Sequence, residues 1–301
     1  MHDRPEPLHI KKPKWLKTKI PTGKTYFEIK RDLRSRKLFT VCEEAKCPNI
    51  GECWNYRTAT FMVLGDTCTR ACRFCNIKTG NPNGWLDPNE PENVAQSAKG
   101  MNLSYVVITM VDRDDLGDGG AEHLTRVISK TKELSPEIIV EVLTGDFQEN
   151  ESALKRLADS KLEVFAHNLE TVRRLSPRVR DARAAYDKSL RVLKRYKEIC
   201  DYDVLTKSAL MLGLGETEDE IKTTLADMRE HGVDIVTIGQ YMRPTKKHLS
   251  IKEFVTPEKF KEYEDYALSL GFHAAVSAPL VRSSYLAGEV YKKTMAQKAQ
   301  S

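Results

Sequence analysis

Several features are missing from this sequence, and each absence narrows the class of protein. No apolar run approaches the ~18–20 residues that a membrane-spanning helix needs, and the N-terminus, MHDRPEPLHIKKPKWLK, has no apolar core of a secretory signal. There is no RGG-like tract, no basic repeat interleaved with aromatics and no zinc-finger spacing with paired histidines. We therefore expect a soluble, cytoplasmic protein with neither a membrane nor a nucleic acid as its partner.

A large charge imbalance is also missing. The 301 residues include 48 Lys and Arg against 43 Asp and Glu, a net charge of +5. This mixed charge, with 40% hydrophobic residues, excludes a disordered chain. Two stretches are locally basic, residues 11–19 and 173–197. Each is either a solvated face or a surface for an acidic partner.

The seven cysteines are unevenly distributed, and their spacing is the strongest signal in the chain. Six of them lie within the 34 residues from Cys42 to Cys75, and only Cys200 lies elsewhere. Disulfides are rare in long cytosolic chains, so clustered cysteines there are typical of metal ligands. Thiolates favour zinc or iron–sulfur clusters. Cys200 has no accompanying motif and is interpreted as an ordinary thiol.

From residue 59 onward, short β-branched or apolar runs alternate with helical patterns. Strands are predicted over residues 59–64, 105–110, 138–143, 162–166, 206–212 and 235–238, and helices near 91–100, 120–133, 149–159, 186–199, 217–231 and 256–270. Such alternation is typical of βαβ units and a parallel α/β sheet, with chemistry at the carboxyl ends of the strands. Before residue 59, we expect an irregular arm over 1–24, a short helix over 25–39 and a loop-like segment over 40–56.

The second cysteine set follows the first predicted strand. Cys68, Cys72 and Cys75 have the spacing C-x3-C-x2-C, and Phe74 precedes the last of them. Three thiolates on one loop can hold three irons of a [4Fe–4S] cube and leave the fourth iron open, whereas electron-transfer clusters usually have four protein ligands. A three-cysteine zinc site with a distant fourth ligand is the alternative.

This loop resembles the signature of the radical S-adenosylmethionine (radical SAM) enzymes. The resemblance implies that SAM binds the open iron and is cleaved to a 5′-deoxyadenosyl radical, which abstracts hydrogen from an unactivated carbon. It also implies a partial (β/α)6 TIM-type barrel. We accordingly expect an N-terminal extension over residues 1–58, the barrel over 59–277 and a C-terminal extension over 278–301.

The first cysteine set, Cys42, Cys47 and Cys53 in VCEEAKCPNIGECW, extends the resemblance to the lipoyl synthases. Other segments agree, among them TATFMVLGDTCTRACRFCNIKTG, ITMVDRDDLGDGGAEH, KSALMLGLGETEDE and RSSYLAGE. The resemblance implies a second, auxiliary [4Fe–4S] cluster held by these three cysteines and a serine of RSSY. We assign that serine to Ser283, with Ser284 as the alternative. An alkoxide is harder than a thiolate and matches iron–sulfur chemistry less well, which suits a cluster that gives up sulfur.

The resemblance also implies the reaction and its partners. Two sulfur atoms would be inserted at carbons 6 and 8 of an octanoyl chain, which is amide-linked to a lysine of a lipoyl carrier domain. Such carriers are oxoacid dehydrogenase subunits and the glycine cleavage H protein. An electron donor such as ferredoxin or flavodoxin and an iron–sulfur carrier are further expected partners. A methylthiotransferase-like enzyme, an iron–sulfur electron carrier and an inactive family member remain alternatives.

SAM-binding residues are expected in the loops after the strands. The resemblance points to Gly119 and Gly120 after the second strand, Asn168 and Glu170 after the fourth, and Gly213 and Gly215 after the fifth. Glycines allow close backbone approach to a ligand, while amide and carboxylate groups suit ribose hydroxyls or an amino group. A flexible turn is the alternative for each glycine segment.

Overall fold

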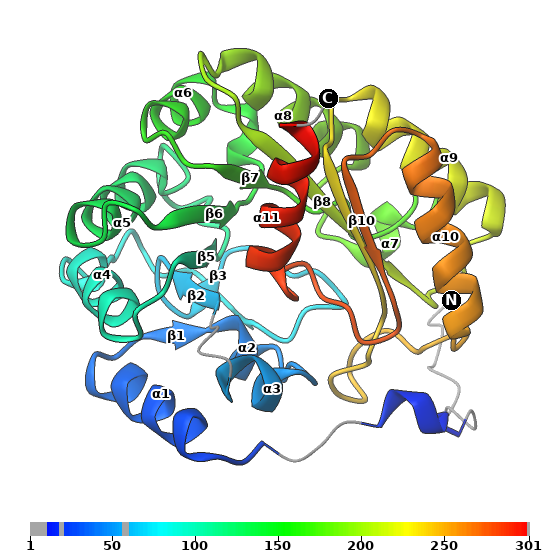
Figure 1. Ribbon diagram of the computed structural model, residues 1–301, viewed down its shortest axis with the longest axis horizontal. Helices are drawn as coiled ribbons and strands as arrows, with labels where there is room; N and C mark the ends of the chain where they lie inside the picture. The colour runs from blue at the N-terminus through cyan, green and yellow to red at the C-terminus, as the bar shows by residue number, and fades with distance from the viewer. Residues whose placement is uncertain (1–10, 18–20, 56–59, 300–301) are drawn as a thin grey trace.

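The computed structural model describes residues 11–17, 21–55 and 60–299, and its centre is one eight-stranded sheet (Figure 1). The sheet order is β1-β2-β5-β6-β7-β8-β9-β10, with β1 antiparallel to β2 and all other neighbours parallel. The strands are β1 (Phe39–Thr40), β2 (Thr60–Val63), β5 (Tyr105–Met110), β6 (Ile139–Leu143), β7 (Val164–Ala166), β8 (Leu205–Leu212), β9 (Ile235–Gln240) and β10 (Ala274–Ser277). Figure 1 shows this sheet curved, with helices around its outside.

The predicted alternation of strands and helices is confirmed. The outer helices are α4 (Glu90–Gly100), α5 (Ala121–Leu134), α6 (Glu151–Asp159), α8 (Tyr186–Ile199), α9 (Glu218–Glu230) and α10 (Pro257–Ser269), and each follows one strand. Helix α9 begins at a capping box, in which Thr217 and Glu220 exchange hydrogen bonds. Each helix covers the outer face of the sheet, which is the arrangement of a partial TIM-type barrel.

Two elements of the barrel region were not predicted. β10 is a seventh parallel strand at the sheet edge, paired with β9. Its sequence, AAVS, is short and rich in small residues, and three of its four residues are only half-buried, so it lacks the apolar run that marks the other strands. The second is a two-stranded parallel sheet of β3 (Thr67–Cys68) and β4 (Lys78–Thr79). It closes the base of the loop that carries the second cysteine set.

The N-terminal segment packs beside β2. It contains η1 (Lys14–Leu16), α1 (Lys24–Ser35), α2 (Val41–Glu44) and α3 (Ile50–Asn55). The helix predicted over 25–39 therefore ends four residues early, and the segment 40–56 is not simply a loop, because α2 begins at a cap in which Thr40 accepts from the Glu43 amide. Most of the expected irregular arm lies outside the described residues, as do residues 56–59. Two short helices thus carry Cys42 and Cys53.

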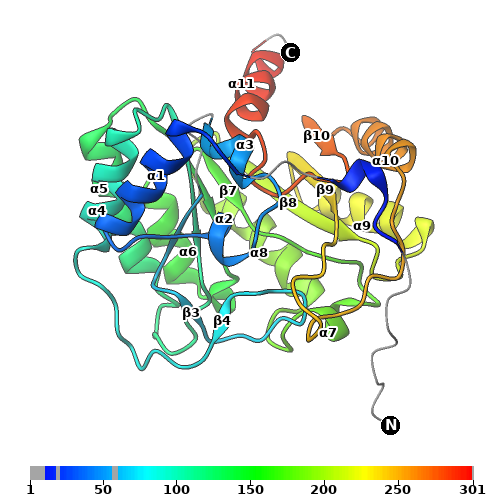
Figure 2. The ribbon, with the colours of Figure 1, turned by 90° about the horizontal axis from the view of Figure 1, so that it is seen from below.

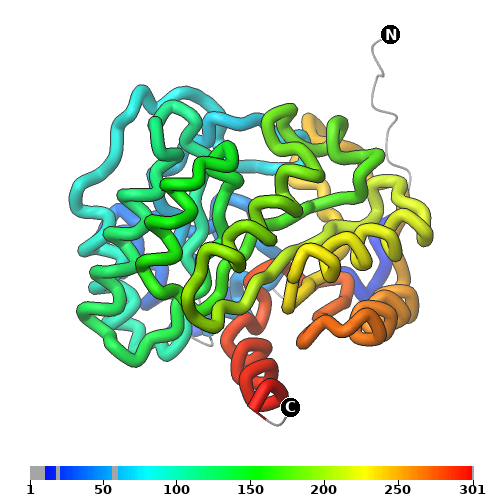
Figure 3. The backbone as a smooth tube through the Cα atoms, turned by 90° about the horizontal axis from the view of Figure 1, so that it is seen from above, coloured from blue at the N-terminus to red at the C-terminus, as the bar shows by residue number. Residues whose placement is uncertain are grey.

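The C-terminal helix α11 (Ala287–Lys298) packs at the amino ends of the strands. Val290 packs with Val164, Leu205 and Ile235, the first residues of β7, β8 and β9. Figure 2 shows α11 projecting from one end of the barrel, opposite β3, β4 and α7 (Ser176–Val179), and Figure 3 shows the same projection from the other side. The carboxyl ends of the strands are therefore left for the cavity described below.

A buried ion pair lies inside the barrel and leads to a stability prediction. Lys207 Nζ contacts Glu141 Oε1 at 2.8 Å, and both side chains are 2% exposed. The Tyr105 hydroxyl donates to the same carboxylate at 2.5 Å. Replacing Lys207 with Met should cost about 3–5 kcal/mol of unfolding free energy, because it leaves a buried carboxylate without its cation. Chemical denaturation of the metal-free protein measures this.

Two comparisons make that prediction specific. Lys130, which pairs with Glu133 on the surface, is the matched control, and Lys130→Met should leave the denaturation midpoint unchanged. The double variant Lys207→Met/Glu141→Leu should recover most of the lost stability, since it removes both charges. A double variant no more stable than Lys207→Met would contradict the electrostatic explanation.

Candidate functional site

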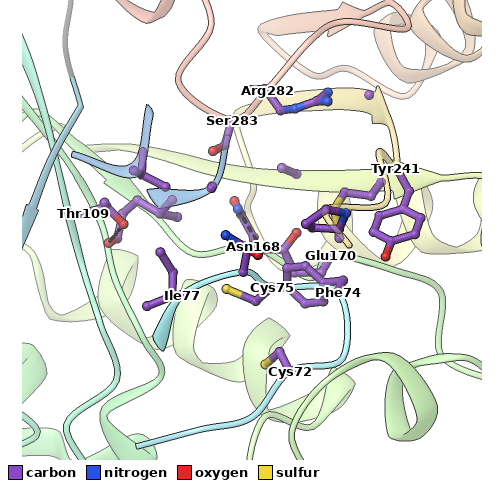
Figure 4. Close-up of a pocket in the computed structure, with 18 of the residues that line it drawn as sticks. Cys72, Phe74, Cys75, Ile77, Thr109, Asn168, Glu170, Tyr241, Arg282 and Ser283 are labelled. Atoms are coloured by element: carbon purple, nitrogen blue, oxygen red, sulfur yellow. Dashed lines mark hydrogen bonds between the residues drawn. The ribbon is translucent and has the colours of Figure 1, made fainter. Parts of the chain in front are cut away.

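A cavity of about 560 Å³ lies at the carboxyl ends of the strands. The loops that follow β5, β6, β7 and β9 line it, together with the second cysteine set and the segment that ends at Ser283. Figure 4 shows Cys72 and Cys75 on one side of the cavity, Arg282 and Ser283 on the other, and Asn168 and Glu170 between them. The cavity therefore lies at the end of the sheet where the βαβ pattern predicts a functional site.

The loop of the second cysteine set is held by contacts with distant segments. The Arg70 amide donates to Cys68 Sγ at 3.4 Å and the Asp181 amide to Cys72 Sγ at 3.3 Å. His248 Nε2 contacts the Cys75 carbonyl at 2.9 Å. Amide donors to sulfur favour the thiolate, the form that binds metal.

Arg70, between the first two cysteines of this set, anchors the loop to the sheet. Its guanidinium is 2% exposed and forms two hydrogen bonds with each of two carboxylates: Asp114, after β5, at 2.8 and 2.9 Å, and Asp146, after β6, at 2.7 and 2.8 Å. Bidentate arginine–carboxylate pairs are strong and geometrically specific. Burial raises the pKa of the neighbouring Asp112 carboxyl to about 6, although Arg70 opposes the rise.

The three thiols of this loop interact with one another. Burial raises the pKa of Cys75 to about 12, and the nearby Cys72 and Cys68 raise it further. Among the described residues, no three His, Cys, Asp or Glu side chains converge on a single metal-ion position. Thiolates arranged around a cavity suit a centre with several irons, each bound by one cysteine. The chemistry of this all-thiol donor set fits an iron–sulfur cluster.

Asn168 and Glu170, both predicted site residues, lie in the cavity wall after β7. Asn168 Nδ2 donates to Glu170 Oε1 at 3.0 Å. The Asn168 Oδ1 atom is buried and has no hydrogen-bond partner among the described residues. A buried acceptor without a donor costs ~1–3 kcal/mol. This pair is thus placed to receive a donor group, such as an amino or hydroxyl group, from a ligand.

The predicted glycines lie outside the cavity wall. Gly119 and Gly120 precede α5, and Gly119 borders a separate hollow of about 350 Å³. The amides of Gly213 and Gly215 both donate to the Glu216 carboxylate, at 2.9 and 3.2 Å. The backbone donors of this segment are therefore used within the loop, and a role for these four glycines in SAM binding stays a prediction.

Sequence reasoning missed a buried polar chain in the cavity wall. Arg180 is 6% exposed, and its Nη1 donates to Ser189 Oγ at 2.9 Å. His167 Nε2 contacts the same hydroxyl at 2.8 Å, while its Nδ1 contacts the Thr144 carbonyl at 2.9 Å. Because a carbonyl only accepts, Nδ1 carries the proton and the Ser189 hydroxyl donates to Nε2. Burial lowers the pKa of His167 to about 4, so the imidazole is neutral at physiological pH.

Nothing local marks Arg180 as a site residue. It lies in the basic stretch 173–197, which reads as a solvated face or a partner surface. Only the turn after α7 brings its guanidinium into the cavity wall, where it acts electrostatically on Glu170 and Cys72. A cation at this point can balance carboxylate and thiolate charge.

The first cysteine set forms a second group of interacting thiols. Burial raises the pKa of Cys53 to about 12, and Cys47 and Cys42 raise it further. Burial likewise raises the pKa of Cys42 to about 11, with Cys47 as the next cause. The Cys47 amide donates to the Cys42 carbonyl at 3.0 Å. Three thiols that are separated in sequence by up to 11 positions therefore interact in one region, where Cys42 is buried and the other two are partly buried.

The RSSY segment packs against this first set. Asn49 Nδ2 donates to the Leu280 carbonyl at 2.7 Å, across 231 positions of the sequence. Burial lowers the pKa of Arg282, and negative charge at Cys47 opposes that change. The Thr60 hydroxyl donates to Ser284 Oγ at 3.0 Å, while Ser283 lines the cavity. These contacts join the segment of the two candidate serines to the segment of the first cysteine set, and a ligand role for either serine stays a prediction.

Comparisons with known proteins agree with this geometry. Residues 62–228 match the radical SAM superfamily, and residues 2–47 match the N-terminal domain of lipoyl synthase. The chain is 55% identical to the mitochondrial lipoyl synthase of Schizosaccharomyces pombe, over 97% of this chain and 80% of that protein. It is 54% identical to the lipoyl synthase of the bacterium Marinobacter nauticus, over 94% of this chain and 81% of that protein.

Solved structures support the fold. The FeFe-hydrogenase maturase HydG of Carboxydothermus hydrogenoformans aligns with a TM-score of 0.56 at 12% identity, over 89% of this chain and 70% of that one. Methylornithine synthase aligns with a TM-score of 0.52 at 14% identity, over 77% of this chain and 64% of that one. In the part of the chain that the structure describes, no helix has the length and apolar character needed to cross a membrane. From its sequence matches over nearly its full length, the chain belongs to the lipoyl synthases, sulfur-inserting enzymes of the radical SAM superfamily.

Proposed function

We propose that this chain inserts two sulfur atoms, at carbons 6 and 8, into an octanoyl chain that is amide-linked to a lysine of a lipoyl carrier domain. One observation carries the proposal: a single cavity has the second cysteine set on one side and Ser283 on the other, and Val41, Ala45 and Pro48, from the segment of the first set, also line it. A substrate in that cavity lies between a site for radical generation and a site for sulfur donation.

This arrangement supports a proposed set of ligands. Cys68, Cys72 and Cys75 would hold the [4Fe–4S] cluster that binds SAM, and Cys42, Cys47, Cys53 and Ser283 would hold the auxiliary [4Fe–4S] cluster. When bound, the first cluster supplies the electron that cleaves SAM, and the second supplies sulfur. Ser283 is preferred to Ser284 because the Ser284 hydroxyl already accepts a hydrogen bond from Thr60.

For SAM, we propose that Asn168 and Glu170 bind the amino or ribose hydroxyl donors, because Asn168 Oδ1 is buried without a partner. Arg180 lies nearby and suits a carboxylate. The four glycines Gly119, Gly120, Gly213 and Gly215 would act by shaping the loops around the site. Of these, Gly120 has a φ of +88°, and a Cβ there would come within 2.7 Å of Leu64.

The cavity also suits an acyl chain. Phe74, Ile77, Met110 and Met211 contribute apolar surface to its wall. Burying an alkyl chain there is favourable by ~0.8 kcal/mol per methylene. Methionine side chains adapt to flexible ligands, which suits a chain attacked at two different carbons.

Partners would be oxoacid dehydrogenase subunits or the glycine cleavage H protein as carriers, with ferredoxin or flavodoxin as electron donor and an iron–sulfur carrier to rebuild the auxiliary cluster. Four exposed lysines would favour an acidic carrier by steering its approach. Two of them, Lys12 and Lys46, line the cavity, and Lys246 and Lys247 lie nearby.

We further propose the division into an extension over 1–58, a barrel over 59–277 and an extension over 278–301. A cytoplasmic location is also proposed; the relative from Schizosaccharomyces pombe is named mitochondrial. Imaging of a fluorescent fusion in the native host would distinguish the two compartments, and localisation to an organelle would overturn the cytoplasmic assignment.

The decisive test is a reaction under anaerobic conditions. The protein is reconstituted with iron and sulfide, then given SAM, dithionite and an octanoyl-lysine peptide. We expect about eight irons per chain, formation of 5′-deoxyadenosine and a peptide mass increase for two added sulfur atoms. Deoxyadenosine without sulfur gain, or sulfur gain on an RNA or ribosomal protein substrate instead, would overturn the proposal.

A further inference from the structure

Trp54, which no part of the proposed reaction uses, has a buried donor without an acceptor. The side chain is 0% exposed, and its Nε1 atom has no hydrogen-bond partner among the described residues. Buried indole N–H groups usually find a partner, since leaving one unpaired is costly. An acceptor stronger than any in the metal-free polypeptide is therefore expected at this N–H.

The surroundings of Trp54 identify where that acceptor would lie. Trp54 follows Cys53 on α3, and the Tyr26 ring packs against the indole with centroids 5.0 Å apart and planes 31° apart. The indole N–H lies close to the Cys42 thiol: burial is the main cause of that thiol's raised pKa, and weak hydrogen bonding by the Trp54 side chain is among the influences that oppose the rise. The indole thus follows one cysteine of the first set in sequence and lies close to another, and a neutral thiol is only a weak acceptor.

We propose that the Trp54 indole N–H donates a hydrogen bond to a sulfur atom of the auxiliary cluster or to the Cys42 thiolate bound to it. This inference rests on the proposed function, because it requires the auxiliary cluster. Tyr26 holds the indole from one face, so the donor direction is set by packing. Trp54 is then a cluster-contacting residue that adjusts the electron density on sulfur.

The expected consequence concerns the potential of one cluster. Hydrogen bonds to cluster sulfurs are among the factors that set reduction potential. A donor stabilises the more negative, reduced state, so its loss lowers the potential. For Trp54→Phe we expect about a tenfold change in the reduction equilibrium of the auxiliary cluster, which is ~59 mV for a one-electron couple. The SAM-binding cluster should keep its potential.

The first experiment is spectroscopic and leaves Trp54 in place. Full-length protein with Trp15→Phe and Trp85→Phe contains one indole, which is labelled with ¹⁵N, and both clusters are reconstituted and reduced. Pulsed electron–nuclear double resonance should detect an exchangeable proton and an indole ¹⁵N coupled to one cluster. Absence of both couplings in protein with about eight irons overturns the inference while leaving the proposed function intact. About four irons would overturn both.

The second experiment is potentiometric and compares two variants. Trp85 is 62% exposed and lies in the loop after β4, so Trp85→Phe is the matched control. Trp54→Phe should lower one of the two midpoint potentials, with eight irons retained, and Trp85→Phe should change neither. An unchanged pair of potentials in Trp54→Phe, or an equal shift in both variants, would overturn the inference.

Discussion

Replacing Cys72 with alanine is expected to abolish 5′-deoxyadenosine formation and to lower the iron content from about eight to about four per chain. Cys72 lies in the middle of its loop, where the Asp181 amide donates to its sulfur at 3.3 Å. With two thiolates left, the loop cannot hold the cluster that binds SAM. Chromatography of the nucleoside products and iron analysis measure both changes.

Cys200 provides the matched control for that variant. It lies at the end of α8, away from both cysteine sets. Cys200→Ala should retain full iron content and full SAM cleavage. Residual SAM cleavage by Cys72→Ala within tenfold of the unmodified protein would remove Cys72 from the ligand set.

Replacing Ser283 with cysteine is expected to preserve the iron content and reduce sulfur insertion by at least tenfold. The thiolate is a softer ligand and binds iron more firmly than an alkoxide, so the corner iron would be harder to release. SAM cleavage should continue, because the second cysteine set is unchanged. Mass spectrometry of the octanoyl peptide, alongside deoxyadenosine measurement, separates the two activities.

Ser284→Ala is the matched control at the adjacent position. Its hydroxyl accepts from Thr60, so the variant should lose only about 0.5–1.5 kcal/mol of stability. Sulfur insertion should stay near the unmodified level. If Ser283→Cys is fully active and Ser284→Ala is not, the ligand assignment moves to Ser284.

Much of the barrel could be predicted because its signals are local. Strand runs such as residues 105–110 and caps such as Thr217 with Glu220 are contained within a few neighbouring positions. β10 and α11 were not predicted, because contacts with distant strands determine them. β10 is a strand because β9 pairs with it, and α11 is positioned by Val290 against the starts of three strands.

The functional site likewise combines features that are visible in the local sequence with features that depend on tertiary contacts. By itself, the sequence determined the two cysteine sets and the resemblance to lipoyl synthases, since spacing along one loop is a local property. Tertiary structure decided which other residues join them. Asn49 forms a hydrogen bond with the Leu280 carbonyl, just before Ser283 and 231 positions away in the sequence. Arg180 lines the cavity, although its basic stretch is typical of an exposed surface. Contacts between distant segments depend on packing and on loop closure, which no local pattern encodes.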